Sequence, residues 1–292
     1  MSSELIDGKA IAAEMRSRIS NEIAALNNAS SRPCLATVVI GDDPSAASYA
    51  RSQAKHAASV GLECRRVELA ADSDMATALK TIESLNADDS VSGIILQMPV
   101  PAGLNGFALQ QAIAPVKDVE GVGPANFGLL AMGSEALVPC TAAAAFACLN
   151  STGVDLRGLE AVVVGRSVIV GKPIAMLLLS AHATVTQCHT RTRDLISHTR
   201  RAEILVVAAG VARLIGAEHV SPGAIVIDVG MHRIVEDAPD GTRKTGTVGD
   251  VRFEEVAPMA RAITPVPGGV GPVTVAMLLA NTVKAYRRSL ET

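Results

Sequence analysis

Residues 161–173 read AVVVGRSVIVGKP, and this stretch decides the fold. Its first four residues have the apolar pattern of a buried strand. Gly165 and Gly171 begin and end the segment that follows this strand. Pro173 suits the first turn of a helix. A strand, a glycine turn and a helix in this order are typical of nucleotide-binding α/β domains, because the helix N-terminus faces phosphate. The spacing is not G-x-G-x-x-G, so an ordinary strand-to-helix turn stays open on these residues alone.

The residues after this turn repeat the pattern. Apolar strands are predicted at 183–187, 204–208 and 224–228, with helices between the first three strands of the series that begins at 161. Such alternation predicts a parallel, doubly wound sheet whose ligands lie beyond the carboxyl ends of the strands. This half of the chain is therefore predicted to be Rossmann-like.

The end of the second strand indicates which dinucleotide this half binds. An NAD site usually has an Asp or Glu there, but this chain has CHTRT at 188–192. Arg166 and Arg191 supply two cations without a carboxylate, which favours the 2′-phosphate of NADP. The alternative is that Arg191 and Arg193 form a solvated surface pair. The candidate cofactor-binding residues are Gly165, Arg166, Ser167, Ile169, Val170, Gly171, Pro173, His189, Thr190, Arg191 and Gly230.

The N-terminal half has its own alternation of strands and helices, which predicts a second parallel α/β lobe. Residues 99–139 are richer in Gly and Pro and are predicted to connect the two lobes. The segment 264–272 is predicted to be a loop before a last helix over 273–288. The predicted strands are 33–40, 63–69 and 91–97, and the predicted helices are 8–26, 44–60, 72 or 73 to 86, and 141–149.

Composition excludes several classes of protein. The 292 residues are 49% hydrophobic with a net charge of −3, which excludes a wholly disordered chain. No block of like charges indicates a nucleic-acid partner, and no apolar run is long enough to span a membrane. Five scattered cysteines and a polar start favour a cytoplasmic protein. The histidines lack metal-ligand spacing, so no metal site is expected.

Motifs over nearly the whole chain resemble the methylenetetrahydrofolate dehydrogenase/methenyltetrahydrofolate cyclohydrolase (FolD) family. They are Tyr49 with its helix, LQMP at 96–99, KDVEG at 117–121, PCT at 139–141, GRSVIVGKP at 165–173, GAIVIDVG at 223–230, VGDV at 248–251 and ITPVPGGVGP at 263–272.

The resemblance implies a two-domain α/β fold, a cofactor, a class of substrate and an oligomeric state. It implies an N-terminal α/β catalytic lobe, here residues 1–140 plus 273–292, to which the last helix returns. It further implies a C-terminal Rossmann-like NADP-binding domain, here 141–272, with tetrahydrofolate derivatives bound between the domains. Family members are cytosolic homodimers, so a cytoplasmic homodimer is expected.

The resemblance also implies the catalytic residues, and three positions depart from the family pattern. Tyr49 would stack on the folate, and Gln97 is the glutamine at the strand end. The lysine that serves proton transfer is replaced by Gln53, the aspartate that binds the pterin by Glu120, and a serine by Ala46. The candidate catalytic residues are thus Tyr49, Gln53, Gln97 and Glu120. Tyr49, Gln97, Glu120, Pro265, Gly268, Gly269 and Pro272 are the candidate substrate-binding residues.

Gln53 decides the predicted activity, because an amide neither accepts nor releases a proton near pH 7. General acid-base catalysis is commonly worth about 10²- to 10⁴-fold, so cyclohydrolase activity should be weak or lost while hydride transfer persists. His56 is either a substitute base or a surface histidine. The prediction is an NADP-dependent 5,10-methylenetetrahydrofolate dehydrogenase.

Three alternatives stay open. The first is the full bifunctional enzyme that produces 10-formyltetrahydrofolate. The second is a non-catalytic nucleotide-binding paralogue. The third is a dehydrogenase acting on a different pterin carrier, because the altered residues are on the substrate side.

Overall fold

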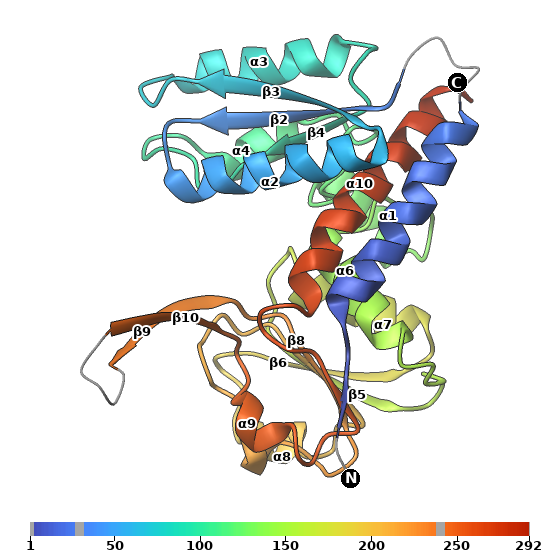
Figure 1. Ribbon diagram of the computed structural model, residues 1–292, viewed down its shortest axis with the longest axis vertical. Helices are drawn as coiled ribbons and strands as arrows, with labels where there is room; N and C mark the ends of the chain where they lie inside the picture. The colour runs from blue at the N-terminus through green and yellow to red at the C-terminus, as the bar shows by residue number, and fades with distance from the viewer. Residues whose placement is uncertain (1–2, 27–31, 238–242, 292) are drawn as a thin grey trace. The chain divides into compact units, whose positions relative to one another are not determined.

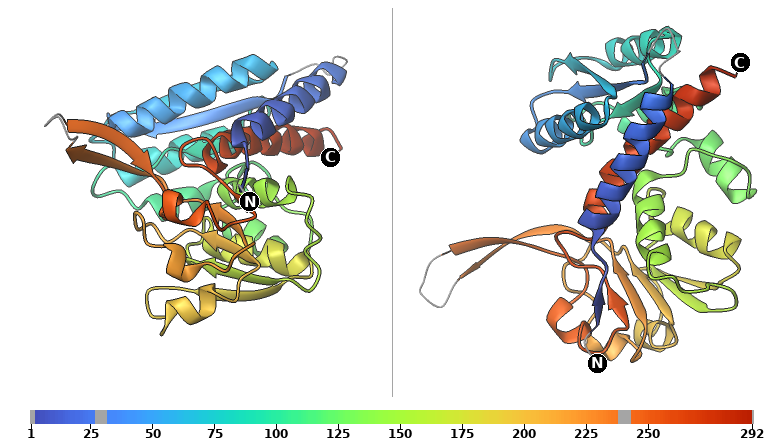
Figure 2. Two further views of the ribbon diagram at one scale, coloured as in Figure 1. Left: turned by 60° about the horizontal axis from the view of Figure 1, so that its bottom comes forward. Right: turned by 45° about the vertical axis from the view of Figure 1, so that its right-hand side comes forward.

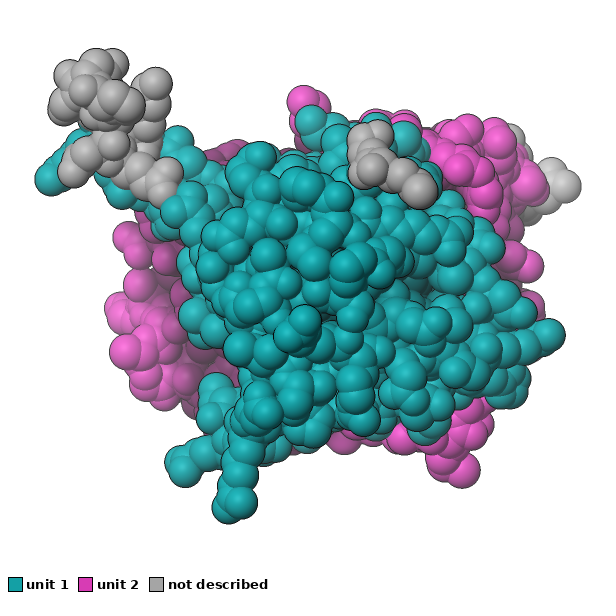
Figure 3. All heavy atoms as spheres, turned by 90° about the horizontal axis from the view of Figure 1, so that it is seen from below, with its two compact units in different colours: residues 1–12, 141–274 teal, residues 13–140, 275–292 magenta. Residues whose placement is uncertain are grey.

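The computed structural model describes residues 3–26, 32–237 and 243–291, and Figure 1 labels their helices and strands. The chain divides into two compact units, which Figure 3 colours separately. Unit 1 comprises Met1–Ala12 and Thr141–Thr274, and unit 2 comprises Ala13–Cys140 and Val275–Thr292. Each unit has its own parallel sheet, which confirms the predicted two-domain α/β fold class.

The sheet of unit 1 is parallel throughout and has the order β1-β11-β8-β7-β5-β6. The chain runs from β5 to β6 on one side and then crosses to β7 on the other, so the sheet is doubly wound with its switch point between β5 and β7. The inner strands β5 (Glu160–Val164), β7 (Ile204–Val207) and β8 (Ile225–Asp228) are almost wholly buried, as expected for a parallel sheet covered on both faces. The strand β6 (Thr184–Cys188) is at the edge of the sheet and is partly exposed.

Two short strands of unit 1 do not follow from the sequence pattern. The strand β1 (Glu4–Leu5) pairs in parallel with β11 (Ala262–Ile263). The N–H of Glu4 donates to Arg261 O at 2.9 Å, and the N–H of Ile6 donates to Ile263 O at 2.9 Å. Residues 1–12 therefore belong with unit 1, whereas the sequence assigned them to the N-terminal lobe. Two-residue strands are too short to show a period.

An antiparallel hairpin is the other feature of unit 1 that sequence analysis missed. Its strands are β9 (His232–Asp237) and β10 (Arg243–Val248), which form a separate two-stranded sheet. Both views of Figure 2 show it projecting from the rest of unit 1. The remaining elements of this unit are α6 (Cys140–Asn150), α7 (Gly171–Ser180), α8 (Leu195–Thr199), a 3-10 turn (Ala217–His219) and α9 (Phe253–Val256).

Unit 2 has a three-stranded parallel sheet in the order β3-β2-β4. The side chains of β2 (Cys34–Ile40) alternate between the two faces: Leu35 packs with α2 (Pro44–Val60), and Ala36 and Val38 pack with α3 (Met75–Ala87). The other strands are β3 (Glu63–Leu69) and β4 (Gly93–Leu96).

Three sequence-based details of unit 2 and the last helix are corrected. The α3 helix is capped by Asp74, whose carboxylate accepts from Thr77 N, and not by Asp72 or Ser73. The predicted connecting stretch 99–139 contains α4 (Gly106–Ala112) and α5 (Pro124–Ala131). The last helix, α10 (Val270–Ser289), starts before Pro272, which is therefore in its first turn.

The last helix returns to the N-terminal lobe, as predicted. Leu278, Leu279 and Val283 of α10 pack with Ile19 and Ile23 of α1 (Gly8–Ala25) in one buried cluster of unit 2. Asn281 adds a polar tether, because its Nδ2 donates to Val119 O at 2.9 Å and to Val138 O at 3.0 Å. Among the described residues, no helix is long and apolar enough to cross a membrane.

Replacing Asn281 by alanine should lower the free energy of unfolding by about 1 to 3 kcal/mol, because the carbonyl oxygens of Val119 and Val138 lose their donor. Thr282→Val is the matched control, since the Thr282 hydroxyl donates to Leu278 O of its own helix, and should cost less than about 1 kcal/mol. Urea unfolding of the two variants measures both changes. Equal stability of Asn281→Ala and the wild type would contradict the tether.

Candidate active site

The helix α2 carries two of the predicted catalytic residues on one face. Tyr49 and Gln53 are four residues apart, which places their side chains one above the other. The helix starts where the Asp43 carboxylate accepts from Ser45 N at 2.9 Å and Ala46 N at 2.8 Å. Gln53 is fully buried, while Tyr49 is 42% exposed and therefore available to a ligand.

The structure joins Gln53 to Gln97, which follows the end of β4. Gln97 Nε2 donates to Gln53 Oε1 at 2.9 Å, and the backbone N–H of Gln97 donates to Val38 O. The Gln53 Nε2 atom is buried and has no hydrogen-bond partner among the described residues. An unsatisfied buried amide is costly, so this donor is expected to meet an acceptor on a ligand or a water molecule.

Glu120 reaches the same end of the sheet through a short parallel pairing. Ile94 of β4 bridges to Asp118, and the N–H of Ile94 donates to Lys117 O at 2.8 Å. Glu120 follows in the turn after Asp118, and it is close enough to Tyr49 to contribute to the raised pKa of that phenol. Its Oε2 accepts from Gln110 Nε2 of α4 at 3.3 Å.

Asp118 holds the turn that positions Glu120. Its carboxylate accepts from Gly121 N at 3.0 Å, from Gly123 N at 2.7 Å and from Asn126 Nδ2 at 3.3 Å. Gly121 has φ +74°, and a Cβ there would be 2.4 Å from Leu137 O, so only glycine fits. The conformation of Glu120 is therefore fixed by buried backbone contacts.

The neighbours of Tyr49 and Glu120 make the site acidic. Burial, with a smaller contribution from the nearby Asp118 carboxylate, raises the pKa of Glu120 to about 7. Burial also raises the pKa of Tyr49 to about 12, with smaller contributions from Cys140 and Glu120. The Cys140 thiol is buried, and its pKa is well above the ordinary range. Glu120 thus titrates near neutral pH beside an un-ionised phenol.

His56 and Ala46 contribute less to this group. His56 has Arg16 and Lys55 as charged neighbours; burial and these two cations lower its pKa. The hydrogen bond between Gln53 and Gln97 does not involve it. Ala46 is buried and has no hydroxyl to offer. A separate pocket of about 490 Å³ opens at the carboxyl ends of β2 and β4, lined by residues 40–44, Ala71 and residues 99–101.

The glycine turn of unit 1 brings backbone segments into close contact at the start of α7. Gly165 has φ +132°, and a Cβ there would be 2.1 Å from Ala208 O; a Cβ on Gly171 would be 2.4 Å from Gly165 O. Ser167 Oγ accepts from Val170 N at 3.1 Å and from Gly171 N at 3.3 Å, which fixes the turn at the start of α7. Ile169 is partly exposed, and Pro173 is buried in the first turn of α7. The turn follows β5 at the switch point, where dinucleotides bind in such folds.

The end of β6 presents a second polar turn next to the glycine turn. His189 N donates to Thr192 Oγ1 at 2.8 Å, and Arg191 N donates to His189 Nδ1 at 3.1 Å. Arg166, Thr190 and Arg191 are exposed. Gln187 Nε2 donates to Gly165 O at 3.1 Å and so ties the two turns together. The residues predicted to bind the adenosine side of the cofactor are thus neighbours.

A network of buried carboxylates lies at the carboxyl ends of the strands of unit 1, and sequence analysis did not identify its member Asp250 as a site residue. Asp250 Oδ2 accepts from Ala209 N at 2.6 Å and Gly210 N at 2.9 Å, and its Oδ1 is 2.6 Å from His232 Nε2. A Cβ on Gly230 would be 2.3 Å from Asp250 Oδ1, so Gly230 packs against this carboxylate. The VGDV motif was the available signal for Asp250.

Asp228 is the second carboxylate of this network. It accepts from Gly230 N at 2.9 Å, Asp250 N at 3.0 Å and Val251 N at 3.0 Å. Burial raises its pKa to about 6 in spite of these donors. The Asp228 N–H donates to Thr264 Oγ1 at 2.7 Å, so the network also fixes the start of the segment 264–272.

The predicted substrate-binding residues of this segment lie in unit 1. Gly269 N donates to Pro265 O at 2.8 Å, and Gly268 has φ +110°. A Cβ on Gly8 would be only 1.7 Å from Gly269 O, so the turn packs tightly on the start of α1. Pro265 and Pro272 are half-buried. In the part of the chain that the structure describes, no group of three or more His, Cys, Asp or Glu residues could hold a metal ion.

Comparison with known proteins gives matches along almost the whole chain. Residues 6–120 match the family model of the tetrahydrofolate dehydrogenase/cyclohydrolase catalytic domain, and residues 139–290 match that of its NAD(P)-binding domain. The bifunctional protein FolD of Synechococcus sp. (strain WH7803) is 49% identical over 97% of this chain and 94% of its own.

Solved structures of such proteins also resemble this chain. The bifunctional enzyme FolD of Campylobacter jejuni is 39% identical with a TM-score of 0.91, covering 99% of this chain and 100% of that one. The FolD of Trypanosoma brucei, complexed with NADP cofactor and an inhibitor, is 36% identical with a TM-score of 0.93, covering 100% of both chains.

The raised pKa of Glu120 predicts a pH-dependent stability difference. The folded chain holds this proton up to about pH 7, while the unfolded chain releases it near the ordinary value of 4.5, so ionisation lowers the free energy of unfolding between these pH values. The Glu120→Gln variant cannot ionise at this position, so its free energy of unfolding does not fall for this reason. Its stability relative to the wild type should rise by about 3 kcal/mol between pH 4 and pH 8 in urea unfolding. A pH-independent difference would show that Glu120 ionises normally.

Proposed function

The chain belongs to the tetrahydrofolate dehydrogenase/cyclohydrolase family, and we propose that it is an NADP-dependent 5,10-methylenetetrahydrofolate dehydrogenase with little or no cyclohydrolase activity. One observation carries the second half of this proposal. Gln53, fully buried and hydrogen-bonded to Gln97, is the side chain at the position where the resemblance implies a lysine. An amide there cannot move a proton near pH 7.

The residues of unit 2 have the chemistry to bind a reduced pterin. The exposed ring of Tyr49 can stack on an aromatic ring of the folate. The Glu120 carboxylate can accept from the amino and ring N–H groups of the pterin, and the hydrogen-bonded amides of Gln53 and Gln97 supply further polar groups in the same unit. Because of its family, we also propose that the protein acts on tetrahydrofolate derivatives. We further propose that it works as a cytoplasmic homodimer.

Residues of unit 1 fit an NADP molecule. The N-terminus of α7, which follows the glycine turn at residues 165–171, can face its pyrophosphate, and Arg166 and Arg191 can pair with its 2′-phosphate. When bound, NADP accepts a hydride from the methylene carbon of the substrate. No hydroxyl proton has to be removed in this step, so the chain needs mainly to hold and orient the folate. Gln53 is compatible with that task.

Hydrolysis of the methenyl product is different, because it needs proton transfers. Water adds to the methenyl carbon and loses a proton, and the bond from that carbon to N5 then breaks as N5 gains a proton and the hydroxyl group loses its remaining proton to become the formyl carbonyl. A side chain that supplies such transfers is worth about 10²- to 10⁴-fold. The second candidate function is the full bifunctional enzyme, which the names of the relatives favour.

Gln53→Lys should raise the rate of methenyl hydrolysis at least tenfold, because it supplies a titratable group at the end of β4. Purified protein is given methylenetetrahydrofolate and NADP, and NADPH and the methenyl compound are followed at separate wavelengths. Gln53→Met is the control and should hydrolyse no faster than the wild type. Wild-type hydrolysis well above the spontaneous rate would favour the bifunctional alternative.

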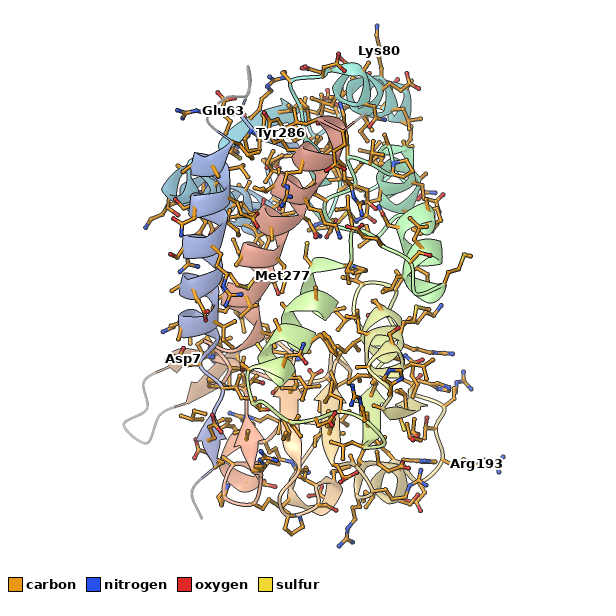
Figure 4. The ribbon with its side chains drawn as sticks, turned by 90° about the vertical axis from the view of Figure 1, so that its right-hand side faces the viewer. Asp7, Glu63, Lys80, Arg193, Met277 and Tyr286 are labelled. Atoms are coloured by element: carbon orange, nitrogen blue, oxygen red, sulfur yellow. The ribbon has the colours of Figure 1, made fainter. Side chains whose placement is uncertain are left out.

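Arg191→Ala should raise the KM for NADP about tenfold or more and leave the KM for NAD nearly unchanged. The substitution removes a cationic partner of the 2′-phosphate, and only NADP has this group. Arg193→Ala is the matched control: in Figure 4 this side chain points away from the ribbon into solvent. Initial rates at varied dinucleotide concentration give both constants. Equal effects on NADP and NAD would argue against the phosphate contact.

A further inference from the structure

The candidate site of unit 2 combines carboxylates with amides and has no basic side chain in its described contacts. Glu120 contacts Gln110, Gln97 contacts Gln53, and Asp118 lies beneath the turn. Burial is the main cause of the raised pKa values of Tyr49 and Glu120, and the carboxylates of Glu120 and Asp118 add to the first and second shift respectively. The buried Cys140 thiol is un-ionised and adds no charge. Among the described residues, no cationic side chain lowers the pKa of Tyr49 or of Glu120. The field at this end of the sheet is therefore negative.

The one lysine close in sequence to Glu120 is held elsewhere. Lys117 Nζ donates to the backbone oxygens of Leu85, Asn86 and Asp88 at 2.8 to 3.2 Å. These three acceptors use all three of its N–H groups. On α2, Lys55 is two residues from Gln53, so its side chain leaves the helix about 200° away. Neither lysine can supply the charge that Gln53 lacks.

We propose that this site binds the cationic methenyl form of the tetrahydrofolate carrier more tightly than its neutral forms and so retains the product of hydride transfer. The inference rests on the proposed function and names the ligand that the same site prefers. In the methenyl compound, one positive charge is shared between N5, the one-carbon unit and N10. The methylene substrate and the 10-formyl compound lack that charge.

Electrostatics gives the direction and size of the preference. An ammonium at position 53 would repel the methenyl cation, whereas the neutral amide of Gln53 does not. Two unit charges a few ångströms apart near a protein surface interact strongly enough to change an affinity tenfold or more. The Glu120 carboxylate, ionised above about pH 7, attracts the same cation. The unpartnered Gln53 Nε2 can donate to a carbonyl oxygen of the pterin ring.

Tighter binding of the product has a kinetic consequence. The equilibrium between bound methylene and bound methenyl forms shifts toward the methenyl form by the ratio of their affinities. Release of the methenyl compound then becomes slow relative to hydride transfer. Gln53 thus changes the enzyme from one that completes the hydrolysis into one that holds its cationic intermediate.

The test compares inhibition by 5,10-methenyltetrahydrofolate with inhibition by 5-formyltetrahydrofolate, whose one-carbon unit has the same oxidation level but no charge. Dehydrogenase rates are measured near pH 8, and the methenyl absorbance is followed so that its concentration is known. We expect the wild-type inhibition constant for the methenyl compound to be at least tenfold lower. Gln53→Lys should reduce this ratio about tenfold, and Glu120→Gln should reduce it in the same direction.

Gln111→Lys provides the matched control, because it adds the same charge at an exposed position of α4. It should leave the ratio of inhibition constants unchanged. A wild-type ratio near one, or a ratio that Gln53→Lys does not change, would overturn the inference while NADPH formation still supports the proposed function. If no NADPH forms, the proposed function fails, and equilibrium dialysis of the two folates still measures the preference.

Discussion

Buried carboxylates that accept backbone N–H groups at strand ends hold both candidate sites in place. In unit 2, Asp118 organises the turn that carries Glu120, and in unit 1, Asp228 and Asp250 join the ends of β7, β8 and β10. Taking these groups out of water is costly, and the raised pKa values of Asp118 and Asp228 record that cost. Several short hydrogen bonds offset it in each case. The turns between strands are therefore as well defined as the strands.

Local pattern was sufficient to predict the strand, glycine turn and helix at residues 161–173, because the apolar period and the glycines act within a few residues. The family resemblance identified both Gln53 and Gln97 as candidate catalytic residues. The structure shows these two side chains in direct contact. It could not identify the partners of Asp250, since these are backbone N–H groups of Ala209 and Gly210, far away in sequence. The pairing of β1 with β11 was invisible for the same reason.

Gln53 shows how one side chain separates two reactions that share a site. Hydride transfer depends on the positions of two ligands, whereas hydrolysis depends on groups that change protonation. A buried glutamine keeps the volume and the hydrogen bond at the end of β4, so the site retains its shape. What it removes is a charge. Under the proposed function, the same fold would therefore accommodate a replacement that changes which product is released.

The β1 strand also constrains the order in which the chain can assemble. Glu4 and Leu5 are synthesised long before the strand beside them, Ala262–Ile263. Domains that close with local contacts can fold while the rest of the chain is being made. The edge of this sheet forms only after β11 has been made, and the α10 residues that pack on α1 follow β11 in the sequence. Contacts between such distant segments are expected to form late in folding.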